Sequence, residues 1–115
     1  MSPRSWRLRG QDILDAIHRA QRILSGVTLE EFKKDEARVL AAMMCVSIVG
    51  EAANKIPESV RQKYPDVAWP EIRGMRNLVS HEYFRVDEAI LFDTCQEHFP
   101  ILKKQIERML DKDDV

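Results

Sequence analysis

Apolar residues recur along most of this chain at the three- and four-residue spacing of a helix face, and no segment shows the alternation of a half-buried strand. The pattern predicts a first helix over about residues 11–24 that ends at Gly26, followed by a capping box from Thr28 to Glu31. A second long helix is expected over residues 35–56, and Pro57 should end it and start a short helix to Tyr64.

After a turn over residues 64–70, a third helix is expected from Glu71 to about Ser80. Asp87 should cap a fourth helix, which continues to Leu110. Pro100 should kink it after Glu97, and residues 111–115 should fray. The sequence therefore predicts an all-α fold, an up-and-down bundle of four to five helices in one domain over residues 1–115.

The middle of the second helix, residues 39–50, is apolar on every side. It is too short to span a bilayer, so it must be buried by protein. Two interpretations remain open and are compatible with each other. The segment is the central core helix of the bundle, or one of its faces is a subunit interface.

The charge is small overall but unevenly distributed. The net charge is −1 for the 115 residues, which excludes a protein that coats nucleic acid by bulk charge. Residues 1–54 carry 8 basic and 7 acidic residues (+1), residues 55–86 carry 6 and 4 (+2), and residues 87–115 carry 4 and 8 (−4). Any contact with nucleic acid should therefore be local to the central segment and sensitive to salt.

The remaining composition indicates a soluble protein of a reducing compartment. Hydrophobic residues make up 44% and charged residues 32% of the chain, as in globular domains. Cys45 and Cys95 lie in apolar helical patterns without C-x-x-C spacing, so we expect buried, reduced thiols. Residues 1–7 are not followed by the apolar region of a secretion signal, so the expected location is cytoplasmic, away from membranes.

The chemistry is concentrated in Arg76-Asn77-Leu78-Val79-Ser80-His81-Glu82-Tyr83. Imidazole titrates near pH 6.5, at about cellular pH, and an arginine fork matches phosphate geometry. This pair suits metal-free cleavage of RNA, since the RNA supplies its own 2′-hydroxyl nucleophile and would be left with a 2′,3′-cyclic end. The competing interpretation is that these residues are helix caps or solvated side chains.

Helical geometry constrains how Arg76 and His81 could act together. Five residues at about 100° each place them about 140° apart on a regular helix, whereas Arg76 and Tyr83 differ by only about 20°. Asn77 and His81 form an i, i+4 pair on an adjacent face. Joint action requires the arginine to reach around the helix, a break near His81, or a second copy of the motif, which a two-fold dimer supplies.

Other site classes find no support in the sequence. His18, His81 and His98 lack the spacing of metal ligands, and no His/Cys/Asp cluster resembles a zinc site. The four glycines form neither a P-loop nor a dinucleotide fingerprint. We therefore expect neither a metal nor a cofactor.

The motif Arg76-x4-His81-x-Tyr83 resembles the R-x(4–6)-H motif of HEPN ribonucleases, in the H-x-Y form of HepT-like toxins. The flanking segments extend the resemblance over about residues 10–110. Residues 50–57 resemble the end of that family's second helix, residues 69–77 its approach to the motif, and residues 83–87 the segment that follows.

The resemblance implies a HEPN bundle that works as a homodimer with both motifs in one cleft. It implies a metal-independent RNase toxin in which Arg76 and His81 are catalytic and Asn77 supports them. The implied partner is a nucleotidyltransferase antitoxin of the MntA type, which transfers AMP from ATP to Tyr83. The added phosphate would occupy the place of the RNA phosphate, so charge repulsion and bulk would both block the site.

Further residues are candidates near the motif. Arg73 shares the side of Arg76, and Arg85 stands where the family often has glycine, so both are expected to contact phosphate. Glu51 and Asn54 either point into the cleft or are polar residues of the helix surface. Two alternative functions also remain: a non-catalytic partner of a minimal nucleotidyltransferase, and a purely structural dimeric helical bundle.

Overall fold

A computed structural model describes residues 5–82 and 86–112 of the protein, with the backbone alone for residues 77–82 and 112. No strand occurs in these ranges, so the all-α fold class is confirmed. The elements in chain order are α1 (Trp6–Ile23), α2 (Leu29–Lys33), α3 (Glu36–Asn54), α4 (Glu58–Arg61), α5 (Trp69–Glu82), α6 (Glu88–Asp93), a π-helical turn (Thr94–His98) and α7 (Phe99–Lys112).

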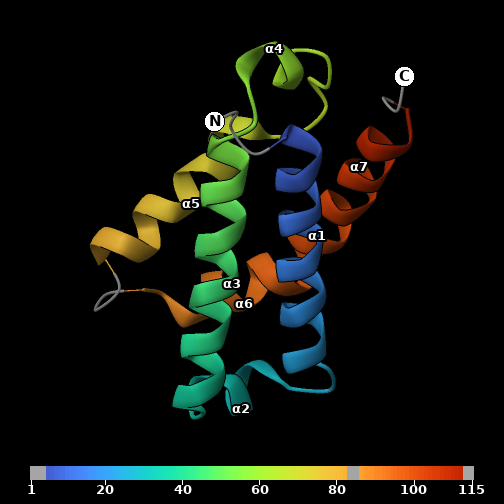
Figure 1. Ribbon diagram of the computed structural model, residues 1–115. Helices are drawn as coiled ribbons and strands as arrows, with labels where there is room; N and C mark the ends of the chain where they lie inside the picture. The colour runs from blue at the N-terminus through green and yellow to red at the C-terminus, as the bar shows by residue number, and fades with distance from the viewer. Residues whose placement is uncertain (1–4, 83–85, 113–115) are drawn as a thin grey trace.

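Helix α3 lies between α1 and α5 and packs against both (Figure 1). It runs antiparallel to α1, and α5 begins beside its C-terminal end and diverges from it. Helix α6 crosses behind α3, while α7 packs on α1. The short helices lie at opposite ends of the bundle, α4 near the start of α5 and α2 near the start of α3.

Side-chain caps begin the helices where the sequence predicted them. The amide of Glu31 donates to the Thr28 hydroxyl at 3.1 Å, and the amide of Thr28 donates to the Glu31 carboxylate at 2.9 Å, which confirms the capping box. These hydrogen bonds, the one from the Thr28 backbone first, lower the pKa of Glu31. Asp87 accepts from the amides of Ala89 (2.9 Å) and Ile90 (3.2 Å) and so caps α6 as expected.

Helix α1 starts five residues before the predicted position. Ser5 is its N-cap and accepts from the Arg7 amide at 3.1 Å. Arg7 in turn donates to the carbonyl of Leu110, which ties the first turn to α7. The apolar period does not reveal this turn because basic residues dominate it. At the other end Gly26, with φ of 73°, follows the helix in the left-handed conformation that favours glycine.

The predicted fourth helix is helical from Glu88 to Lys112, but it is divided by the π-helical turn Thr94–His98. Pro100 lacks an amide hydrogen and cannot donate to the carbonyl four residues earlier, so a disturbance of the helix before it is expected. Helix α7 includes Asp111 and Lys112, the first two residues of the expected frayed tail. The last three residues lie outside the described ranges.

The core is built from residues of all the long helices. Ile13, Ile17, Val49, Phe99 and Ile106 are fully buried, and Cys45 and Cys95 are buried free cysteines, as the sequence predicted. Within the described ranges no helix has the length and apolar character to cross a membrane.

The chain itself does not bury α3 on all sides. Leu40 and Met44 are 57% and 61% exposed, although other residues of the same apolar segment are buried. The expectation of burial all round is therefore wrong for a single copy of the chain. Helices α1 and α5 cover two sides of α3 and leave the face between them open.

Candidate active site

Glycine at position 50 lets α3 and α5 approach closely. A Cβ atom on Gly50 would lie 2.8 Å from the backbone nitrogen of Arg76, 3.1 Å from the Arg76 Cβ and 3.1 Å from the carbonyl oxygen of Ile72. The first of these distances is shorter than a carbon–nitrogen contact allows. Only a residue without a side chain permits this approach, which brings Arg76, the arginine of the motif, against α3.

Two polar pairs flank the Gly50 contact. Arg76 Nη1 lies 3.8 Å from a carboxylate oxygen of Glu51, and Arg73 Nε donates to Asn54 Oδ1 at 3.2 Å. The later residue of α3, Asn54, thus pairs with the earlier arginine of α5, Arg73, as expected for antiparallel helices. Glu51 and Asn54 thus both contact arginines of α5, and both arginines remain partly exposed.

The predicted turn before α5 is anchored at several points. The indole Nε1 of Trp69, a residue 6% exposed, donates to the carbonyl of Tyr64 at 3.0 Å. From α7, Gln105 donates to the carbonyl of Asp66 and Arg108 pairs with its carboxylate, each at 3.0 Å. These contacts hold the start of α5 and therefore the position of Arg73 and Arg76.

Helix α5 continues without interruption through Asn77, His81 and Glu82, beyond the predicted end at Ser80. The helix ends at Glu82, one residue after His81. A regular helix leaves positions 76 and 81 about 140° apart, so one copy of α5 does not bring them together on one face. Tyr83 and Arg85, the expected modification site and phosphate contact, lie outside the described residues.

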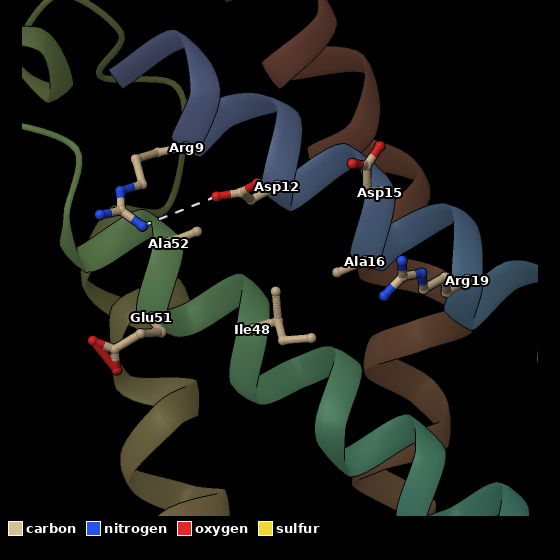
Figure 2. A pocket seen from close by; sticks show the side chains of 8 residues that line it. All are labelled: Arg9, Asp12, Asp15, Ala16, Arg19, Ile48, Glu51 and Ala52. Carbon is tan, nitrogen blue, oxygen red and sulfur yellow. Dashed lines mark ion pairs between the residues drawn. The ribbon is translucent and has the colours of Figure 1, made fainter. Parts of the chain in front are cut away.

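A groove between α1 and α3 adjoins this arrangement (Figure 2). Arg9, Asp12, Asp15 and Arg19 line it from α1, with an Arg9–Asp12 ion pair at 4.0 Å. Glu51 lines it from α3 and also pairs with Arg76 on the other side. The carboxylate of Glu51 thus lies between the groove and Arg76, the arginine of the motif.

One cation beside the site was not among the predicted residues. Arg61 of α4 donates from Nη1 to the carbonyl of Ile56, just beyond the end of α3. Burial and, next, the positive charge of Arg73 lower the pKa of Arg61, while Glu58 acts in the opposite direction. The only signal in the sequence was the basic excess of residues 55–86, which does not single out one residue.

Comparison with known proteins agrees with this arrangement. The family model described as "Ribonuclease HepT-like" matches residues 13–109. This chain belongs to the HepT-like ribonuclease family. The resemblance read from residues 50–57 and 69–87 is therefore confirmed, and with it the HEPN-type fold.

HepT-like relatives cover most of the chain. A "Putative RNase" of Methanocaldococcus jannaschii is 33% identical over 86% of this chain and 82% of its own length. A "Putative RNase" of Caldanaerobacter subterraneus subsp. tengcongensis is 37% identical over 78% of this chain and 80% of its own length. A "Probable ribonuclease HepT" of Thermococcus cleftensis is 31% identical over 86% of this chain and 90% of its own length. No solved structure matches the chain.

Proposed function

We propose that this protein is a metal-independent endoribonuclease toxin of a toxin–antitoxin pair. The observation that carries the proposal is the placement of Arg76. Within a HepT-like ribonuclease chain, the arginine of the R-x4-H motif lies where α3 and α5 approach closely at Gly50, partly exposed and held beside Glu51. A guanidinium so placed is available to a phosphate from solvent.

The proposed reaction is transesterification within the RNA. His81 accepts the proton of the 2′-hydroxyl, whose oxygen attacks the adjacent phosphorus, and the bond to the 5′-oxygen of the next nucleotide breaks. The leaving oxygen takes a proton from the His81 imidazolium or from water, and a 2′,3′-cyclic phosphate remains. Arg76 stabilises the charge on the phosphoryl oxygens in the transition state, and Asn77 supports the pair by hydrogen bonding.

We place the active site in a homodimer. Because α5 is regular from Arg76 through His81, a second copy of the motif is the most direct way to combine both groups. The open face of α3 is the surface we assign to the second copy. Leu40 and Met44 lie one turn apart on it, with the partly buried Ile48 next in line.

The border of this apolar face has both signs of charge. Along α1, Arg9 and Arg19 enclose Asp12 and Asp15 in the groove beside Ile48 (Figure 2). A surface that meets its own copy needs opposite charges within itself, and a border of one sign would repel. The groove also leads to Glu51 and Arg76, so a copy bound there would lie beside the motif.

Regulation is proposed to act on Tyr83. A nucleotidyltransferase antitoxin of the MntA type would transfer AMP from ATP to the phenol oxygen and release pyrophosphate. In the sequence Tyr83 comes directly after Glu82, the last residue of α5, and seven positions after Arg76. The new phosphodiester would compete with RNA for the guanidinium of Arg76.

The test is RNA cleavage in EDTA by the purified wild type, Arg76→Ala and His81→Ala. We expect the wild type to leave 2′,3′-cyclic ends and each variant to lose at least about a hundredfold in rate, the scale of one acid–base or oxyanion contact. Full cleavage by His81→Ala would remove the catalytic assignment. A wild type that binds a nucleotidyltransferase but does not cleave RNA would identify the non-catalytic partner instead.

Mixing the two inactive variants tests the shared site. If Arg76 of one subunit works with His81 of the other, exchange of subunits between Arg76→Ala and His81→Ala restores one intact site per mixed dimer. We expect activity to return on mixing. If the mixture stays inactive after subunit exchange has been verified, each subunit uses its own pair.

A further inference from the structure

Three arginines are held by acceptors at and just beyond the C-terminal end of α3. Glu51 pairs with Arg76, Asn54 accepts from Arg73, and the carbonyl of Ile56 accepts from Arg61. The arginines come from two elements, α5 and α4, both of which lie near this helix end (Figure 1). The arrangement is therefore a tertiary feature and no single helix face contains it.

Arg61 and Arg73 differ from Arg76 in the charge of what holds them. Their acceptors, a carbonyl and an amide oxygen, are neutral, whereas the acceptor of Arg76 is a carboxylate. The negative charge of Glu58 raises the pKa of Arg61 but is the smallest of the three effects on it. Two guanidiniums with neutral acceptors leave a local positive charge that an anion can neutralise.

The two guanidiniums are held at the same helix end. Their acceptors, Asn54 and the carbonyl of Ile56, are two residues apart in the chain, the positive charge of Arg73 lowers the pKa of Arg61, and both arginines are partly exposed. A guanidinium has five N–H donors, so a hydrogen bond to one acceptor leaves donors that can meet phosphate oxygens. Such a pair is destabilised by repulsion until an anion binds between its members.

We propose that Arg61 and Arg73 form a phosphate-binding subsite for the RNA strand, next to the phosphate that Arg76 holds. The inference rests on the proposed ribonuclease function and adds Arg61 to the substrate-binding residues. Arg73 lies three residues before Arg76 on α5, a rise of about 4.5 Å along the helix axis. The subsite therefore lies next to the cleavage site along α5. Contacts to phosphate position the strand without reading its bases.

The first experiment measures binding separately from cleavage. In the His81→Ala background, a fluorescent single-stranded oligoribonucleotide is titrated by anisotropy over a series of salt concentrations. Loss of one phosphate contact lowers the magnitude of the negative slope of log K against log salt by about 0.7 for single strands. We expect this fall with Arg61→Gln and with Arg73→Gln. Lys33→Gln, at the opposite end of the bundle on α2, should keep the parent slope.

Glutamine at position 61 retains a donor for the Ile56 carbonyl, and circular dichroism with thermal melting will verify that each variant is folded. Arg61→Lys, which keeps the charge, should restore most of the slope. The subsite is refuted if folded Arg61→Gln has the slope of Lys33→Gln, or if the His81→Ala protein does not bind RNA at all.

Cleavage kinetics separate this inference from the function on which it rests. With an active parent, we expect Arg61→Gln to raise KM more for a longer oligoribonucleotide than for a dinucleotide, which cannot span both sites. An equal change for both substrates contradicts the subsite while the ribonuclease assignment stands. If the parent binds RNA with the expected salt slopes but does not cleave it, the subsite stands and the ribonuclease assignment fails.

Discussion

The backbone nitrogen of Arg76 lies where only a glycine can face it, 2.8 Å from the place a Cβ atom would take on Gly50. The two residues are separated by 26 positions in the chain and belong to antiparallel helices. This contact sets the distance between α3 and α5 and thereby the distance at which Glu51 and Asn54 meet the arginines of α5.

Substitution of Gly50 by alanine should destabilise the protein and disturb the site together. The added methyl group meets backbone, which cannot rotate away, so α5 must shift. We expect a loss of about 1–3 kcal/mol in the free energy of unfolding, measured by chemical denaturation, and a lower rate of RNA cleavage.

Gly74 provides the matched control for this substitution. It lies on α5, the helix that faces Gly50, and a Cβ atom there would meet nothing within 4 Å. Gly74→Ala should stabilise the protein by about 0.5–1 kcal/mol through helix propensity. Equal effects of the two substitutions would contradict the close approach at Gly50.

Removal of the charge on Glu51 should strengthen RNA binding with little effect on stability. The Glu51–Arg76 pair is 3.8 Å long with side chains 50% and 36% exposed, and such pairs contribute about 0–1 kcal/mol. Without the carboxylate, Arg76 attracts phosphate more strongly, so Glu51→Gln should lower the Kd for RNA about two- to fivefold at low salt. Anisotropy titration measures this, with Glu107→Gln on α7 as the control; weaker binding would show that Glu51 instead orients Arg76.

A charge on the open face of α3 should separate the proposed dimer. Met44→Lys places an ammonium group in the centre of the apolar face, and we expect a monomer by sedimentation together with loss of RNA cleavage. Ile90→Lys is the control, because Ile90 is 57% exposed but lies on α6, away from this face. A Met44→Lys protein that remains dimeric would exclude the α3 face as the interface.

The two thiols should be unreactive while the protein is folded. Burial, and next the neighbouring Cys45, raises the pKa of Cys95 to about 12, and burial raises that of Cys45. At pH 8 a disulfide reagent should therefore label both residues only after denaturant is added. Rapid labelling of the native protein would contradict the described core.

The same shifts set the direction of a pH effect on stability. The folded state holds the thiol protons more tightly than the unfolded state. This contribution to stability is complete below the ordinary thiol pKa, near 9, and is lost as the pH rises from there toward 12. Denaturation curves of the wild type and Cys95→Ala should therefore converge as the pH is raised above 9.

The sequence alone determined the features that depend on neighbours along the chain. The caps at Thr28 and Asp87, the end of the first helix before Gly26 and the disturbance caused by Pro100 were all predicted. Each follows from hydrogen bonds or packing periods that span a few residues, so the residue types in one window suffice. The motif from Arg76 to Tyr83 was likewise visible, and its resemblance led to the family.

Only the tertiary structure decided which of these residues meet. It paired Glu51 with Arg76 and Asn54 with Arg73, brought Arg61 to the same helix end, and showed that the chain itself leaves Leu40 and Met44 exposed. These relationships depend on how closely α3 and α5 approach and in which register. Gly50 permits the close approach because it has no side chain. A glycine in the sequence does not show which residue will lie against it, so this contact could not be predicted.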